Sequence, residues 1–221
     1  MKYTISGEIA QFARLEFGPG EPVWSSRGAI MTYTDGVTWE LKIPGGLSGA
    51  VKRSFAGEGI ALTRITAQKP EQVVLLATSA PGHIMVWDLA DGPVITTRGS
   101  FLAAWGNQID INVTIARKAG AAFFGGSGLL LQKVSGQGFV LIHASGDFEE
   151  RVLDAKETIL VSTGHLAAFA EGVDYDIKGV GGCRKMLFGG EGLFMTKLTG
   201  PGKVLLQTLK RHVQTQTSSS R

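Results

Sequence analysis

Three pairs of adjacent basic residues are the positions in this sequence best suited to binding an anion. Each pair stands a few residues before a glycine-rich segment, and the pairs are Lys52-Arg53, Arg117-Lys118 and Arg184-Lys185. Clustered positive side chains attract the phosphates of lipid headgroups or of RNA without needing a catalytic residue. If the three segments superpose, the pairs form a basic rim around one axis. Their offsets from the glycines differ, which favours the simpler interpretation that they are solvated loop charges.

His165 is a second candidate, because it interrupts a repeated pattern. It stands where two related segments carry Ala29 and Ser100. A residue that differs among repeats could line one pocket for a small molecule between the repeats, and drift between repeats explains the difference equally well. The other histidines are His83, His143 and His212, and no two of the four are spaced as a metal-binding pair at i, i+2 or i, i+4. We therefore predict no metal and no cofactor, since zinc takes three or four protein ligands.

Hydrolytic chemistry would need a nucleophile, a base and an orienting acid, and Ser162, His165 and Asp174 are the residues that could be so combined. Such a triad is recognised by its geometry and not by composition. The sequence contains no Gly-x-Ser-x-Gly elbow between a strand and a helix. None of its glycine-rich segments continues into Lys-Ser or Lys-Thr on a helix, as a phosphate-binding loop does. We expect a protein that binds or assembles and is not an enzyme.

The elements that must position these residues come from a repeated sequence. One motif, Phe-x-Gly-x-Gly, ends at Gly59, Gly128 and Gly192, which are 69 and 64 residues apart. A second motif has nearly the same period, and its members are Val23–Ile30, Val94–Phe101 and Ile159–Leu166. Two motifs that share one period indicate three related structural units.

The pattern between the motifs is typical of β-strands. Phe12–Phe17 alternates with the period of a half-buried strand. Ser135–Gly138 and Thr199–Gly202 are predicted turns, each leading into another apolar run. Glycine accounts for 31 of 221 residues, roughly twice the usual share, as turns with positive φ require. No stretch predicts a helix of about twelve residues or more, so the expected fold class is all-β.

The order of the motifs suggests how the units are divided. The chain begins with a half-unit that carries the second motif and ends with one that carries the first. We therefore expect a single domain over residues 1–208 with pseudo-threefold symmetry. Two of its units are predicted at residues 45–112 and 119–178, and the third is formed by residues 181–208 joined with residues 1–42.

Several segments together resemble the AIM24 family, also known as the DUF124 proteins. They are Met1–Gly7, Thr163–Leu166, Val173–Ile177, Phe188–Gly192 and Thr199–Thr208, and the resemblance covers about residues 1–208. It implies three TRAP-like β-sandwich units in one chain, after the tryptophan RNA-binding attenuation protein. A mitochondrial member of the family is linked to inner-membrane organisation, and the family offers no catalytic residues to transfer. Ser127 departs from the Glu that the other two glycine motifs carry.

Charge and composition limit the partners. The formal net charge is +3, and the terminal residues Lys210, Arg211 and Arg221 account for all of it. Residues 209–221 are expected to form a polar, disordered tail, so the positive balance is weak support for a nucleic-acid partner. The single cysteine, Cys183, excludes an internal disulfide. Without a secretory signal or a run of roughly 20 apolar residues, a cytoplasmic protein with no transmembrane segment is expected, at most peripheral to a membrane.

These observations favour a non-enzymatic scaffold or binding protein. We expect it to form homo-oligomers and to bind an anionic lipid surface through the basic rim. One alternative is an RNA-binding module, by analogy with the TRAP fold, although fold analogy is a weak warrant for function. The other is a small-molecule binding protein with a site between the repeats, near His165.

Overall fold

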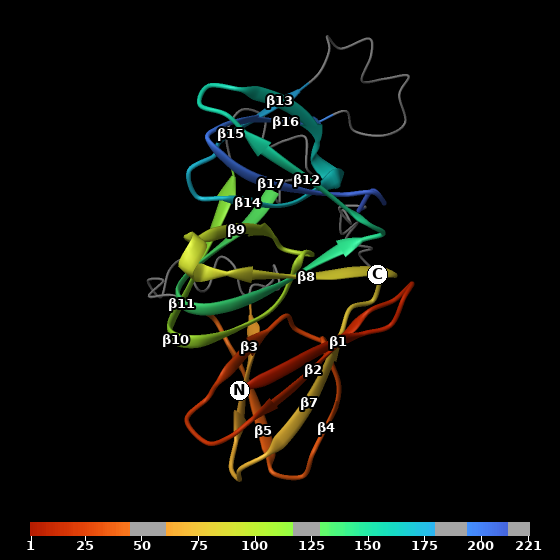
Figure 1. The fold of residues 1–221 in the computed structure, drawn as a ribbon, viewed down its shortest axis with the longest axis vertical. Helices are drawn as coiled ribbons and strands as arrows, with labels where there is room; N and C mark the ends of the chain where they lie inside the picture. The colour runs from red at the N-terminus through yellow and green to blue at the C-terminus, as the bar shows by residue number, and fades with distance from the viewer. Residues whose placement is uncertain (45–60, 117–128, 180–193, 212–221) are drawn as a thin grey trace, which may run out of the picture.

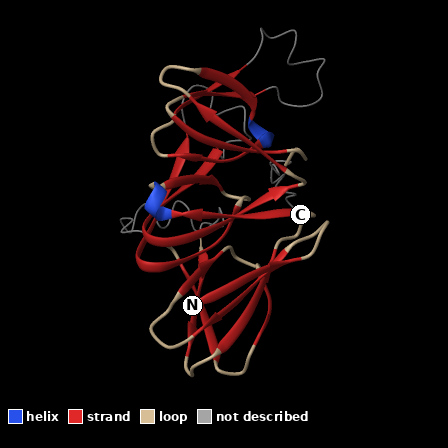
Figure 2. Cartoon of the chain, viewed as in Figure 1, coloured by secondary structure: helices blue, strands red, loops and turns tan. Residues whose placement is uncertain are grey.

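The computed structural model describes residues 1–44, 61–116, 129–179 and 194–211, and these residues form an all-β protein. Antiparallel strands make three sheets, and the helical residues among them are two short 3-10 turns at Leu89–Asp91 and Thr163–His165 (Figure 2). The prediction of an all-β fold is therefore confirmed. None of the described segments contains a helix long and apolar enough to cross a membrane.

The strands fall into three consecutive stretches of chain. The first stretch, residues 2–77, contains β1 (Lys2–Ser6), β2 (Phe12–Phe17), β3 (Val23–Ser25), β4 (Ile30–Tyr33), β5 (Val37–Lys42), β6 (Leu62–Ala67) and β7 (Gln72–Ala77). The second, residues 82–145, contains β8 (Gly82–Asp88), β9 (Val94–Thr97), β10 (Phe101–Ala116) and β11 (Leu129–Ser145). The third, residues 148–207, contains β12 (Phe148–Leu153), β13 (Thr158–Ser162), β14 (Leu166–Ala170), β15 (Asp174–Gly179), β16 (Phe194–Thr199) and β17 (Gly202–Gln207).

Corresponding strands pair in the same way in each stretch. The hairpin β5–β6 of the first stretch matches β15–β16 of the third. In the second stretch the same hairpin is formed by the far half of β10 and the near half of β11. The last strand of each stretch is flanked by two others, so that β7 lies between β2 and β4 as β17 lies between β12 and β14. The near half of β10 and the strand β8 flank the far half of β11 in the same way.

Two shared strand pairs join the stretches. The first and second stretches meet where β3 pairs with β10, and the second and third meet where β9 pairs with β14. Figure 1 shows the result, with the first stretch at the bottom of the long axis and β13, β15 and β16 at the top. The buried side chains form three clusters, and each of the two joints contributes side chains to the clusters on both of its sides.

The predicted division of the chain is wrong in one respect. The strands of residues 1–42 pair among themselves, with β6 and β7 and with β10, and none of them pairs with the described strands of residues 194–207. The third unit is therefore not formed by residues 181–208 joined with residues 1–42. The physical reason is the hairpin, since the strand before each glycine motif pairs with the strand directly after it.

Two further predictions need correction. Ser135–Gly138 is not a turn between two strands, because β11 runs through it without interruption and bends at Gly136 and Gly138, whose φ angles are 120° and 149°. The chain end is ordered beyond residue 208: the Leu209 amide donates to the Ser145 carbonyl and the Arg211 amide to the Gly164 carbonyl, each at 3.0 Å. Residues 212–221 lie outside the described part of the chain.

Candidate functional site

The six basic residues of the predicted rim lie outside the described residues. Lys52 and Arg53 belong to the segment between β5 and β6, Arg117 and Lys118 to that between β10 and β11, and Arg184 and Lys185 to that between β15 and β16. The strands on either side are paired up to their last described residues, since Lys42 lies opposite Leu62, Ala116 opposite Leu129 and Gly179 opposite Phe194. The three predicted basic pairs thus belong to the connecting segments of three corresponding hairpins.

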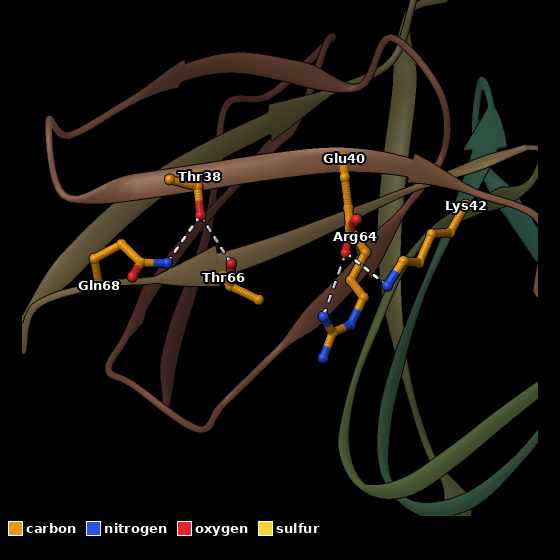
Figure 3. A network of polar contacts seen from close by, with 6 residues as sticks. All are labelled: Thr38, Glu40, Lys42, Arg64, Thr66 and Gln68. Atoms are coloured by element: carbon orange, nitrogen blue, oxygen red, sulfur yellow. Dashed lines mark hydrogen bonds and ion pairs between the residues drawn. The ribbon is translucent and has the colours of Figure 1, made fainter.

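The exposed face of the first hairpin carries a polar network (Figure 3). The Glu40 carboxylate lies 2.7 Å from Lys42 Nζ and 3.5 Å from Arg64 Nη1. These contacts, and above all the hydrogen bond from Lys42, lower the pKa of Glu40. Further along the strands Thr38 and Thr66 share a hydrogen bond of 3.0 Å, and Gln68 donates to Thr38. Both cations of this face are already paired with Glu40, so neither is free of a carboxylate partner, and the three side chains together keep one positive charge.

The imidazole ring of His165 contacts a backbone carbonyl. Its Nδ1 lies 2.8 Å from the carbonyl oxygen of Gln207, while the Gln207 side chain donates to the carbonyl of Gly164 at 2.7 Å. Within the described residues no hydrogen bond connects His165 with Ser162 or Asp174, so the conceivable triad is not assembled. The ring stands beside the C-terminal segment, which packs against the Gly164 backbone.

Arg211, assigned to the tail by sequence, is the centre of a buried polar cluster. Its Nη1 donates to Ser100 Oγ at 2.9 Å and its Nη2 donates to Ser145 Oγ at 3.2 Å. The guanidinium lies directly on Gly99, where an added Cβ would come within 2.6 Å of it. Burial lowers the pKa of Arg211 to about 10, so the side chain is still charged at neutral pH. No carboxylate of the described chain forms an ion pair with Arg211.

His143 is the second buried titratable residue of the cluster. It is almost fully buried, and its Nε2 lies 2.9 Å from Thr78 Oγ1, which also donates to the carbonyl of Ala80. Burial, followed by the positive charge of Arg211, lowers the pKa of His143 to about 4. The imidazole is therefore neutral at pH 7. Since the Thr78 hydroxyl proton goes to Ala80, Nε2 carries the ring proton and Nδ1 is left as an unpaired acceptor.

This cluster fastens the C-terminal segment of the described chain. Arg211 connects Ser100 and Ser145 of the second stretch with Gly164 of the third, using side-chain and backbone bonds together. The two serine hydroxyls accept from a cation, and no hydrogen bond among the described residues joins either hydroxyl to a basic side chain that could activate it as a nucleophile. The described residues include no group of three or more metal-ligating side chains. The sequence signal that could have located the cluster is Ser100, which stands at the position of His165 in the repeated motif.

The fold defines an all-β protein whose three stretches of antiparallel strands are linked end to end by shared strand pairs within one sheet. The chain matches the model of the family described as "Mitochondrial biogenesis AIM24" over residues 3–209, and it belongs to this family, as the sequence predicted. An uncharacterized protein of Streptococcus pyogenes serotype M6 is 28% identical over 238 residues, covering 99% of this chain and 93% of that protein. The crystal structure of a Streptococcus pyogenes protein superposes with a TM-score of 0.77 and 26% identity, covering 95% of this chain and 94% of the other.

Proposed function

We propose that this protein is a non-enzymatic scaffold that binds an anionic lipid surface through Lys52, Arg53, Arg117, Lys118, Arg184 and Lys185. One observation supports the proposal above the others: each segment that carries a basic pair connects the two strands of a hairpin, and the three hairpins occupy corresponding positions and are paired at their bases. Repeating one loop position three times multiplies a weak electrostatic contact. Each basic residue near an anionic membrane contributes roughly 1 kcal/mol, so six of them are sufficient for peripheral binding.

We also propose that the three stretches are TRAP-like repeats. The support is the pairing pattern, in which the same hairpin and the same flanked last strand occur in each stretch. The position of one β-bulge adds to it. The register shifts between Ile30 and Thr32 in β4, between Phe101 and Ala103 in β10 and between Leu166 and Ala168 in β14. These are matching positions of the second sequence motif.

The proposal is tested by vesicle co-sedimentation. The wild-type protein is mixed with vesicles of phosphatidylcholine alone and with vesicles that also contain phosphatidylserine. We expect binding only to the anionic vesicles, with a strong decrease as salt rises, because screening weakens exposed charges. Replacing the six basic residues by alanine should abolish the binding.

A control variant removes the same charge from other places. Lys2, Arg27, Lys69, Arg98, Arg151 and Lys156 are exposed and lie outside the three segments. If their replacement by alanine weakens vesicle binding as much as the first set does, binding reflects net charge and the proposed sites are wrong. If the wild-type protein binds single-stranded RNA in a salt-dependent manner and ignores the vesicles, the RNA-binding alternative replaces the lipid proposal.

A further inference from the structure

The two joints between stretches follow one register. In the first joint Ser25 lies opposite Ala103 and Trp24 opposite Ala104. In the second joint, at matching positions of the repeated motif, Thr96 lies opposite Ala168 and Ile95 opposite Phe169. Each joint therefore pairs a strand formed by the first half of the second motif, β3 or β9, with the strand that begins the second half of the next stretch.

A hydroxyl at the end of the motif strand, β3 or β9, reinforces each joint. Ser26 Oγ donates to the carbonyl of Phe101, and Thr97 Oγ1 donates to the carbonyl of Leu166. Ser26 and Thr97 are matching residues of the motif, as are Phe101 and Leu166. The residue that matches them in the third stretch is Ser162, at the end of β13.

Apolar side chains of the joints pack across the boundary between stretches. Leu102 of the second stretch packs in the core cluster that otherwise belongs mostly to the first stretch, and Ala167 of the third packs in the core of the second. In the opposite direction Trp24 packs against the core of the second stretch and Ile95 against that of the third. Each joint thus supplies side chains to the cores on both of its sides.

Each end of the molecule carries one strand of the kind that forms a joint, but without a described partner strand from a neighbouring stretch. β13 corresponds to β3 and β9 in the last stretch, and β4 corresponds to β10 and β14 in the first. Among the described strands β13 pairs only with β16, and β4 pairs only with β7. Side chains at positions that are buried or partly buried in the internal joints are exposed here, and their exposed fractions are 62% for Met31, 47% for Tyr33 and 58% for Leu160.

These two edges also lack the protection that the other edges have. Charged side chains or proline on an edge strand discourage pairing with another chain. β1, β5, β12 and β15 end their sheets and each carries at least one charged residue, whereas β4 and β13 carry none. Of the described strands that end a sheet, the only two without charge are the two halves of the missing joint.

We propose that β13 of one copy of this chain pairs antiparallel with β4 of a second copy and so repeats the internal joint between molecules. In the register of the internal joints, Val161 lies opposite Thr32, Leu160 opposite Tyr33 and Ile159 opposite Thr34. Ser162 Oγ then donates to the carbonyl of Ile30. One chain does not close this pair by itself, because β13 and β4 lie at opposite ends of the long axis (Figure 1).

The pairing joins two different surfaces, so each added copy presents a free edge for another. Contacts of this heterologous kind produce a closed ring or an open filament, depending on the rotation between neighbours. The inference does not depend on the proposed lipid binding, and it is tested without any lipid.

The test uses two variants that each block one end. Leu160→Asp places a charge on β13 and Tyr33→Asp places one on β4. Both variants should fold normally because both side chains are exposed, and circular dichroism checks this. In sedimentation velocity the wild-type protein should form species larger than one chain that grow with concentration. Each variant alone should be monomeric. An equimolar mixture should form a species of two copies and nothing larger, since each variant keeps the half that the other lacks.

Val152→Asp is the matched control, because Val152 is 74% exposed on the charged edge strand β12. It should assemble like the wild-type protein. A wild-type protein that stays monomeric at every attainable concentration would overturn the inference. So would single variants that assemble normally, or a mixture of the two that stays monomeric.

Discussion

Arg211 shows how one residue at the edge of the described chain can hold two stretches together. Its side chain satisfies Ser100 and Ser145, while its amide bonds the Gly164 carbonyl. Arg211→Met keeps much of the side chain's bulk and removes both side-chain bonds. We predict a loss of about 1–3 kcal/mol in the free energy of unfolding, because buried hydroxyls are left without their donor. Urea unfolding measures it.

Two companion variants make that measurement specific. Arg211→Lys keeps the charge but lacks the planar pair of donors, so it should recover only part of the loss. Arg151→Met removes an exposed arginine on β12 and should change the free energy by no more than about 0.5 kcal/mol. Equal stability of the Arg211→Met and Arg151→Met proteins would show that the cluster does not fasten the chain.

His143 makes the stability depend on pH. Its pKa falls from the ordinary value of 6.5 to about 4 in the folded protein, because the ring is buried and Arg211, with His83, lies near it. A depressed pKa means that the unfolded chain binds the proton first. The contribution is therefore complete above about pH 6.5 and is lost as the pH falls towards 4, by no more than about 3 kcal/mol.

The substitution His143→Gln isolates this effect, since Gln207 occupies the same position in the third stretch and is also buried. The difference in unfolding free energy between the wild-type protein and the variant should shift in favour of the variant as the pH is lowered from 7 to 4. Curves that run parallel over this range would mean that His143 does not titrate on unfolding in the way described.

The structural roles of individual residues could be predicted only in part from the sequence. Aligning the repeated motif matched Ser26, Thr97 and Ser162, and the hydrogen bonds of the first two are equivalent. The role of Arg211 was not predicted, because a polar residue near a chain end is equally typical of a disordered tail and of a buried hydrogen-bonded contact. His165 broke the motif, yet its ring contacts a backbone carbonyl, a partner that no spacing of side chains reveals.

Among the elements, β10 and β11 are unusual because each is one continuous strand where the other two stretches have two separate strands. A turn separates β4 from β5 and another separates β14 from β15, whereas β10 runs from Phe101 to Ala116. Gly106 and Gly138 lie opposite each other at the bend, with φ angles of 140° and 149°. A Cβ on either glycine would come within 2.1 Å of a carbonyl oxygen of the facing strand. These glycines let the long hairpin bend without a break.

Gly138→Ala should therefore cost more than about 1 kcal/mol of unfolding free energy, from strain at positive φ and from the clash with the Trp105 carbonyl. Thermal and urea unfolding report the loss. Gly18→Ala is the control, since its added Cβ meets only ordinary contacts at 3.7 and 3.9 Å. If both variants unfold alike, the bend tolerates a side chain and the close approach of the strands is not required.

The division into units shows what a repeated sequence leaves open. A period specifies the distance between equivalent positions but not where a unit begins. The glycine motif looked like a boundary, whereas it lies between the two strands of a hairpin, as the pairing of Lys42 with Leu62 shows. Only long-range pairing decides this, and short strands of similar composition do not encode their partners in local pattern.

At the scale of the whole molecule, the two proposals reinforce each other. A chain that assembles through β13 and β4 would present the three basic segments again in every copy. Contacts that are individually weak then act together, because each further contact occurs at a high effective concentration. Vesicle binding by the wild-type protein should therefore become steeper with protein concentration than binding at independent sites.

The assembly-blocked variant Leu160→Asp separates the two effects. It retains all six basic residues, so it should still bind anionic vesicles, but with an affinity at least about tenfold weaker than that of the wild-type protein. Mixing it with the Tyr33→Asp protein should recover part of the difference, since pairs of copies then form. Equal binding by Leu160→Asp and wild type, measured where the wild type is assembled, would mean that a single chain supplies the whole membrane contact and that assembly serves another purpose.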